Sequence, residues 1–183
     1  MKGKSDPEDG GPKPVGKDFT MKYCQECGTA LTGRELEREG VVPFCPACGE
    51  YRFPMYNVAV SMIVVNEENR KTLLIKQYGR DYFRLVAGYV NRTETLEHAA
   101  ARELKEETGM TAERITFNRT RFFEPSNTLM CNFTVYVKDD GELNPNDEID
   151  SFEWFSFEDA RKNINPENLA GRFLCAFLDG QEQ

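Results

Sequence analysis

Glutamates at positions 103, 106 and 107 are the residues of this 183-residue chain whose spacing most clearly indicates chemistry. Residues three and four positions apart lie on one face of a helix, so Glu103, Glu106 and Glu107 share a face. Three neighbouring carboxylates repel one another, and a divalent cation relieves that repulsion. Mg²⁺ or Mn²⁺ suits hard oxygen ligands and can also bind phosphate oxygens and water. An acidic helix face alone is more often only solvated, so the surrounding pattern must decide between the two readings.

A longer pattern does surround the glutamates. Between Gly88 and Met110, nine residues stand at the spacing G-x5-E-x7-R-E-U-x-E-E-x-G-U, with U apolar: Gly88, Glu94, Arg102, Glu103, Leu104, Glu106, Glu107, Gly109 and Met110. This pattern resembles the signature box of Nudix hydrolases. The resemblance implies that water cleaves a nucleoside diphosphate linked to another group, with the three helical glutamates on the catalytic Mg²⁺ or Mn²⁺. It also implies that Glu94 pairs with Arg102 to brace a loop-helix-loop, although Arg102 could equally form an ordinary surface ion pair.

The glutamates require a helix, which the flanking residues predict over 95–108. Thr95 is a suitable N-cap, and Gly109 suits the left-handed residue that ends a helix. An apolar stripe beside the carboxylates can pack on a sheet; it consists of Leu96, Ala100 and Leu104. His98 points away from the carboxylates, which disfavours it as a general base, and the sequence identifies no other base.

Four cysteines near the N-terminus form a second pattern, in which two Cys-x2-Cys pairs are separated by 17 residues: Cys24, Cys27, Cys45 and Cys48. This is the spacing of a zinc ribbon, whose four thiolates hold a structural Zn²⁺ in a closed tetrahedral site. Iron in the same site is the chemical alternative. Disulfides are less favoured because no secretory signal precedes the cysteines. Cys131 and Cys175 stand alone and are predicted to be inert thiols.

A four-cysteine ribbon directly before this box resembles the bacterial NADH pyrophosphatases. That resemblance implies that Tyr89, in AGYV, stacks on a base. It gives Glu148, six residues before Trp154, the role of a fourth metal ligand, and it places Ala170 beside the substrate. The residues alone leave other readings open: Tyr89 as a packed aromatic at a strand end, Glu148 as part of a solvated acidic loop, and Ala170 as part of a packed helix.

The resemblance breaks in one segment that bears on specificity. Those pyrophosphatases carry SQPWPFPxS after the box, whereas this chain reads TRFFEPSNT, with Phe123 where the tryptophan would stand. Phe122 and Phe123 could clamp a flat base or belong to an ordinary strand. The leading prediction is hydrolysis of NADH or NAD⁺ to two mononucleotides. ADP-ribose or another ADP-sugar is the alternative substrate, and NAD-cap RNA decapping or a non-catalytic nucleotide sensor ranks lower.

The elements expected to position these residues are strands at 56–65, 72–77, 82–87, 113–123, 129–138 and 152–156 and helices at 95–108, 157–163 and 166–179. For the last helix, Asn165 is the expected cap, Pro166 the first helical residue and Gly180 the end. The fold class is α/β: an α/β/α sandwich with a mixed sheet, preceded by the small zinc ribbon. The expected domains are a disordered tail or leader at 1–20, the ribbon at 21–53 and the hydrolase domain at 54–183.

Composition limits the partners. The formal net charge of −8 disfavours nonspecific binding to nucleic acid, because such binding depends on Lys and Arg. No apolar run is long enough to span a membrane, and the cysteine usage suits a reducing compartment, so the expected location is cytoplasmic. We expect a small-molecule dinucleotide or nucleotide-sugar substrate. The resemblance leaves a homodimer open.

Overall fold

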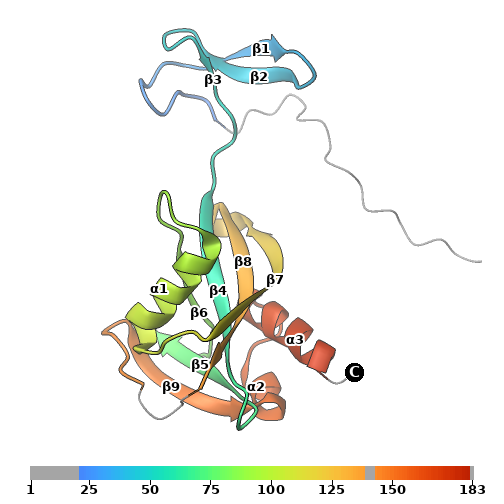
Figure 1. Ribbon diagram of the computed structural model, residues 1–183. Coiled ribbons are helices and arrows are strands. Elements are labelled where there is room, and N and C mark those ends of the chain that lie inside the picture. Colours follow the sequence, from blue (N-terminus) through green and yellow to red (C-terminus); the bar gives the residue numbers. More distant parts are fainter. Residues whose placement is uncertain (1–20, 139–142, 182–183) are drawn as a thin grey trace, which may run out of the picture. The chain divides into compact units, whose positions relative to one another are not determined.

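The structure is a computed structural model that describes residues 21–138 and 143–181 (Figure 1). It divides into two compact units between Met55 and Tyr56, two residues after the boundary expected from the sequence. The predicted disordered tail at 1–20 lies outside the described residues. Among the described residues, no helix is both long and apolar enough to cross a membrane.

The N-terminal unit is a small antiparallel sheet with the order β1-β2-β3, formed by β1 (Thr32–Leu36), β2 (Gly40–Cys45) and β3 (Glu50–Tyr51). Most of its side chains are half-buried or exposed, and the buried apolar residues among those described in this unit are Cys24, Val42, Pro43 and Cys45. So few buried side chains stabilise a fold weakly.

The second unit is built on a six-stranded mixed sheet: β4 (Asn57–Asn66), β5 (Lys71–Gln77), β6 (Val86–Tyr89), β7 (Arg114–Phe123), β8 (Thr128–Val137) and β9 (Ile149–Ser156). The strand order is β7-β8-β4-β5-β9, with β6 paired to β4. The two central strands β4 and β8 are parallel, and the other pairs are antiparallel. Both faces of β4 are covered, which explains why its sequence VAVSMIVV is almost continuously apolar.

Helices cover both faces of the sheet (Figure 1). They are α1 (Leu96–Thr108), α2 (Phe157–Asn163) and α3 (Leu169–Gln181). Alternate residues of β4 enter two separate cores: Met62 packs with Leu104 of α1, whereas Ile63 packs with Phe173 of α3. The α/β/α sandwich with a mixed sheet is therefore confirmed.

Three predicted elements are wrong at their boundaries. The strand expected at 152–156 is β9, which begins at Ile149. The strand expected at 82–87 is β6 at Val86–Tyr89, because Arg84 forms an isolated bridge with Ile75 of β5 before the chain crosses to β4. The helix expected at 166–179 begins at Leu169 and continues to Gln181.

The start of α3 shows why that boundary moved. Asn168 acts as the cap, since its Oδ1 accepts a hydrogen bond from the backbone N–H of Gly171 at 2.8 Å. The Asn165 side chain accepts from the N–H of Glu167 instead, and Pro166 lies before the helix. Gly180 is helical and lies one residue before the last described residue, Gln181. A short 3-10 turn, Glu124–Ser126, joins β7 to β8.

Candidate functional site

Helix α1 begins and ends where its flanking residues predict. The Thr95 side chain accepts from the N–H of His98 at 3.3 Å, and Gly109 adopts a left-handed φ of 76° that ends the helix. Ala100 and Leu104 are fully buried against the sheet, whereas His98 is exposed. The helix therefore turns its glutamate face toward the preceding loop and the strand ends.

Arg102 ties the helix to the loop before it. Its Nε and Nη2 donate to the two carboxylate oxygens of Glu94 at 2.8 and 2.9 Å, and Nη2 also donates to the backbone oxygen of Tyr89 at 3.0 Å. This two-point contact lowers the pKa of Glu94 to about 2, and a hydrogen bond from the backbone N–H of Asn91 is the second-largest cause of that shift. The remaining nitrogen, Nη1, donates to Glu103 at 2.7 Å and Glu106 at 2.9 Å. One guanidinium thus joins the loop and two of the helical glutamates.

At Gly88, β6 approaches α1 closely. A Cβ atom placed on Gly88 would lie 1.9 Å from the carboxyl carbon of Glu103, which is far inside van der Waals contact. The side chain of Glu103 therefore occupies the space that any other residue at position 88 would fill. The first glycine of the sequence pattern is explained by this packing rather than by a turn.

Glu107 is the buried carboxylate of the site, with 4% of its surface exposed. Its Oε2 accepts from the side-chain amide of Gln77 at 3.0 Å. Burial, followed by the charges of Glu103 and Glu148, raises the pKa of Glu107 to about 8. The three carboxylates therefore repel one another electrostatically, and a divalent cation among them would relieve this repulsion.

Glu148 comes from the chain that follows β8, and the end of α1 positions that chain. Backbone N–H groups of Asn144 and Asn146 donate to the last carbonyl oxygens of α1, on Thr108 and Glu107, at 3.0 and 3.1 Å. Glu148 itself accepts from the phenol of Tyr78 at 2.9 Å. This hydrogen bond raises the pKa of Tyr78. The position of Glu148 is thus fixed by α1, which holds the preceding residues, and by Tyr78 directly after β5.

The glutamates are less tightly gathered than the cysteines. Within residues 21–138 and 143–181, the only group of three or more potential metal ligands within mutual ligand range is the set of four thiols. Glu103 and Glu106 turn an oxygen toward Arg102, while Glu107 faces Gln77 and Glu148 faces Tyr78. Their donor chemistry, all carboxylate oxygen, fits Mg²⁺ or Mn²⁺.

The cysteine cluster has the geometry of a tetrahedral thiolate site. All four Sγ atoms lie within 4.8 Å of one another, with Cys24 to Cys48 at 3.9 Å, Cys27 to Cys45 at 3.5 Å and Cys27 to Cys48 at 3.4 Å. Four ligands at the usual Zn–S length would be separated by about 3.8 Å. A hydrogen bond from Nε of Arg52, at 3.3 Å, lowers the pKa of Cys24 to about 6 and favours its thiolate.

Each Cys-x2-Cys pair closes through a glycine. The N–H groups of Gly28 and Gly49 donate to the carbonyls of Cys24 and Cys45 at 2.8 and 2.9 Å, with φ of 71° and 74°. A glycine directly after the second cysteine of each pair is a sequence signal of this turn. It adds support to the metal-site interpretation.

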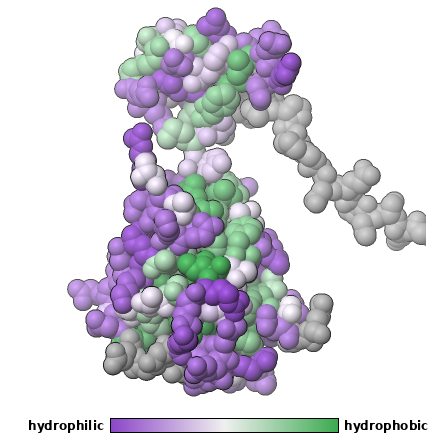
Figure 2. Space-filling view, in the orientation of Figure 1, coloured by the Kyte–Doolittle hydropathy of each residue, from purple (hydrophilic) through white to green (hydrophobic). Residues whose placement is uncertain are grey.

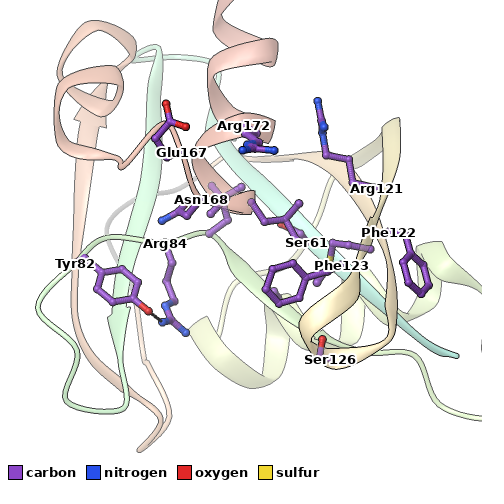
Figure 3. Close-up of a pocket in the computed structure, with 15 residues that line it drawn as sticks. Ser61, Tyr82, Arg84, Arg121, Phe122, Phe123, Ser126, Glu167, Asn168 and Arg172 are labelled. Atoms are coloured by element: carbon purple, nitrogen blue, oxygen red, sulfur yellow. Dashed lines mark hydrogen bonds between the residues drawn. The ribbon is translucent and has the colours of Figure 1, made fainter.

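A pocket of about 610 Å³ lies in the second unit (Figure 3). It is lined by Ser61, Tyr82, Arg84, Leu85, Ala87, Arg121, Phe122, Phe123, Ser126, Met130, Glu167, Asn168, Leu169, Ala170 and Arg172. Phe123 and Ala170 therefore line one cavity, although they are 47 positions apart in the chain. Tyr89 is 57% exposed and is not among the lining residues.

Exposed aromatic residues distinguish this side of the unit from α1. Phe122 and Phe123 are 51% and 38% exposed near the end of β7. Figure 2 shows mostly hydrophilic residues over α1, with hydrophobic residues gathered beside it near β7 and β8. The pocket therefore combines aromatic and aliphatic walls with polar groups.

Sequence reasoning missed Gln77, Tyr78 and Arg84. All three lie at or near the end of β5 or in the crossing to β6. Only the fold brings Gln77 to Glu107, Tyr78 to Glu148 and Arg84 to the pocket. The available signal was the change from the apolar run TLLI to polar residues at the strand end. Arg52, the partner of Cys24, was missed for the same reason.

Comparison with known proteins identifies the second unit. A family model described as the NUDIX domain matches residues 55–175. The NAD-capped RNA hydrolases NudC of Pseudomonas aeruginosa and Vibrio vulnificus are 30% and 31% identical over 75% and 87% of this chain. The chain spans 48% and 59% of their lengths.

Solved structures agree on the fold. A NUDIX hydrolase from Nitrosomonas europaea superposes with a TM-score of 0.63 at 22% identity, covering 88% of this chain and 93% of that one. The Ap4A hydrolase of C. elegans gives a TM-score of 0.56 at 23% identity, covering 68% of this chain and 98% of its own. These likenesses support the fold alone.

Proposed function

Because this chain belongs to the NUDIX family, we propose that it is a metal-dependent pyrophosphohydrolase that cleaves NADH or NAD⁺ into two mononucleotides. The observation that carries the proposal is the acidic surroundings of buried Glu107, which shares a face of α1 with Glu103 and whose pKa is raised to about 8 by burial and by the charges of Glu103 and Glu148. Such a group of carboxylates is unfavourable without a cation, and phosphate chemistry is what a divalent cation there would serve.

In this proposal Glu103, Glu106, Glu107 and Glu148 hold Mg²⁺ or Mn²⁺. The bound metal would neutralise charge on the diphosphate and activate water. Arg102 acts as a positioning residue, since it fixes Glu94 and the loop while orienting Glu103 and Glu106. Gln77 orients Glu107, and Tyr78 orients Glu148.

The nucleoside part of the substrate is assigned to the pocket. Phe123 offers an aromatic face and Ala170 a small apolar surface, both suited to a planar base. Tyr89, exposed at the end of β6, remains a proposed stacking residue outside this pocket. The names of the relatives support NAD-type substrates.

NAD-capped RNA is a second candidate substrate. Arg121 and Arg172 line the pocket, and both are exposed. Exposed arginines at a nucleotide pocket suit further phosphates beyond the cleaved linkage. The named activity of the relatives points in the same direction. ADP-ribose stays the alternative because the segment TRFFEPSNT departs from the pyrophosphatase signature.

The ribbon is proposed to hold a structural Zn²⁺ through Cys24, Cys27, Cys45 and Cys48. The sulfur distances and the lowered pKa of Cys24 support this assignment. A closed set of four thiolates leaves no position for a substrate. The proposed role of the zinc is therefore folding of the N-terminal unit, separate from the hydrolysis.

Turnover with Mg²⁺ and with Mn²⁺ across NADH, NAD⁺, ADP-ribose, diadenosine polyphosphates and NAD-capped RNA tests the function. We expect NADH or NAD⁺ to lead and Glu106→Gln to abolish turnover. Glu97→Gln is the matched control, because Glu97 lies in the first turn of the same helix and is exposed. Leading turnover of ADP-ribose would reassign the substrate. Nucleotide binding without any cleavage would identify a sensor instead of an enzyme.

A further inference from the structure

Arg84 has a buried donor that its surroundings leave unused. Its backbone is fixed by two hydrogen bonds to Ile75, at 2.9 and 3.0 Å. Its Nη2 donates to the phenol of Tyr82 at 2.8 Å, whereas its Nε is buried and has no hydrogen-bond partner among the described residues. A buried donor without a partner is costly, and native sites that retain one often use it for a ligand.

The position of Arg84 joins two parts of the site. It lines the 610 Å³ pocket (Figure 3), so it lies within reach of a molecule placed there. It is also close enough to Glu107 to lower the pKa of that carboxyl, against the larger upward effect of burial. Arg84 therefore lies between the pocket that it lines and Glu107 of α1.

The charge of the pocket favours an anion. Its lining residues include three arginines, Arg84, Arg121 and Arg172, against one acidic residue, Glu167. The chain as a whole carries a formal net charge of −8, so this positive group is a local exception. Guanidinium groups bind phosphate through paired N–H donors, and burial strengthens such hydrogen bonds.

We propose that Arg84 donates hydrogen bonds to the diphosphate of the substrate, so that the nucleoside lies in the pocket and the diphosphate extends past Arg84 to the glutamates. The pocket and the carboxylates are then one continuous substrate site. This assignment rests on the proposed function and adds to it a binding residue that the sequence pattern does not contain. The assignment also orients the substrate, with its nucleoside in the pocket and its diphosphate toward the glutamates.

The test compares two probes that differ only in the diphosphate. Binding of α,β-methylene-ADP, whose bridging carbon prevents cleavage, and of adenosine is measured by calorimetry in Mg²⁺ with the full chain. We expect Arg84→Gln to weaken binding of α,β-methylene-ADP by at least about 10-fold and to leave adenosine unchanged. Arg84→Lys retains the charge but loses the paired donors, so it should fall between Arg84→Gln and the unsubstituted chain.

Arg119→Gln is the matched control, because Arg119 is an exposed arginine of β7 that does not line the pocket. It should bind both probes as the unsubstituted chain does. Thermal unfolding of each variant checks the fold, and if Arg84→Gln does not fold, Arg84→Lys carries the test. Equal binding of α,β-methylene-ADP by the folded Arg84 variants and the unsubstituted chain would overturn the assignment, as would equal loss of adenosine.

Kinetics separate this assignment from the proposed function. With the substrate that the unsubstituted chain hydrolyses fastest, Arg84→Gln should raise KM by at least about 10-fold with kcat much less affected, because the contact exists before and during reaction. Absence of any turnover by the unsubstituted chain would refute the proposed function, while the binding comparison still decides on Arg84. Normal KM in Arg84→Gln would refute the Arg84 assignment while leaving the proposed function standing.

Discussion

The cysteine cluster and the carboxylate site differ in how much of the fold each needs. Two short turns and the pairing of β1 with β2, which sets Thr32 opposite Phe44, bring the four thiols together, and each cysteine pair is closed by its own glycine. The carboxylates come from α1 and from the chain before β9, and β5 supplies their hydrogen-bond partners. A site formed by residues close in sequence can be predicted from their spacing, whereas a site formed by distant elements can be predicted only in part.

The two sites also differ in the chemistry of their ligands. Four thiolates are soft ligands in a closed site, which suits a metal that stabilises a unit with a small core. Carboxylates held by arginine, amide and phenol partners suit a metal that can exchange water and substrate. Each kind of metal should therefore affect a different unit, and the predictions below test that separation.

Removal of zinc should have the largest effect. Structural Zn²⁺ contributes on the order of 10 kcal/mol to small domains, so Cys45→Ser or a strong chelator should unfold residues 21–55. Hydrogen exchange would report this as loss of protection in β1 to β3. Protection in β4 and β8 should stay the same, and its loss in parallel would contradict the separation of the units.

Loss of Glu148 should reduce turnover by at least about 10²-fold, because it removes a proposed metal ligand while leaving an exposed position free to accept an amide. Glu148→Gln would be compared with Glu153→Gln, an exposed glutamate of β9. Both variants should unfold at nearly the temperature of the unsubstituted chain. Near-full activity of Glu148→Gln would remove it from the metal site.

Replacement of Arg102 should cost about 10- to 100-fold in turnover or metal affinity, as is typical of residues that orient metal ligands. Lysine keeps the charge but cannot contact Glu94 at two points and also reach Glu103 and Glu106. Arg102→Lys would be measured for both kcat/KM and Mg²⁺ dependence. If the variant needs no more Mg²⁺ than the unsubstituted chain, the contacts of Arg102 do not contribute to metal binding.

The smallest effect is a pH dependence of stability from Glu107. Its pKa of about 8 lies above the ordinary value, so the folded state holds the proton more tightly, and metal-free stability should fall as pH rises from about 4.5 through 8. Above that range the ionised carboxylate is free to bind metal. Mn²⁺ should therefore raise the unfolding temperature more at pH 9 than at pH 6.

Glu107→Gln should be insensitive to this change of pH in the metal-free state. A thermal unfolding series at both pH values, with and without Mn²⁺, measures the effect. Equal stabilisation by Mn²⁺ at pH 6 and pH 9 would show that proton release from Glu107 is not linked to metal binding.

Local signals accounted for much of what the sequence predicted. Thr95 and Gly109 predicted the start and end of α1, because capping interactions act within one helical turn. The strands β4, β5 and β8 were identified from their long apolar runs. The strand at 82–87 was misplaced because Arg84 pairs with β5, whereas pairing with β4 begins only at Val86. That crossing is a tertiary feature with no periodicity of its own.

The partners of the glutamates were missed for a related reason. Gln77 and Tyr78 are separated from Glu107 and Glu148 by 30 and 70 positions. Spacing within one helix cannot report such contacts, because they depend on where β5 ends. The start of α3 shows the same limit on a smaller scale, since Asn165 and Asn168 are both reasonable caps and packing around Gly171 selects the second.

The central claim is that the carboxylates of α1, with Glu148, hold a divalent cation that serves hydrolysis. Electron paramagnetic resonance of Mn²⁺ titrated into the zinc-loaded protein tests it most directly, with Glu107→Gln and Glu97→Gln run beside the unsubstituted chain. We predict saturable Mn²⁺ binding that Glu107→Gln weakens by at least about 10-fold and Glu97→Gln leaves intact. Equal Mn²⁺ affinity in all three proteins would contradict the claim.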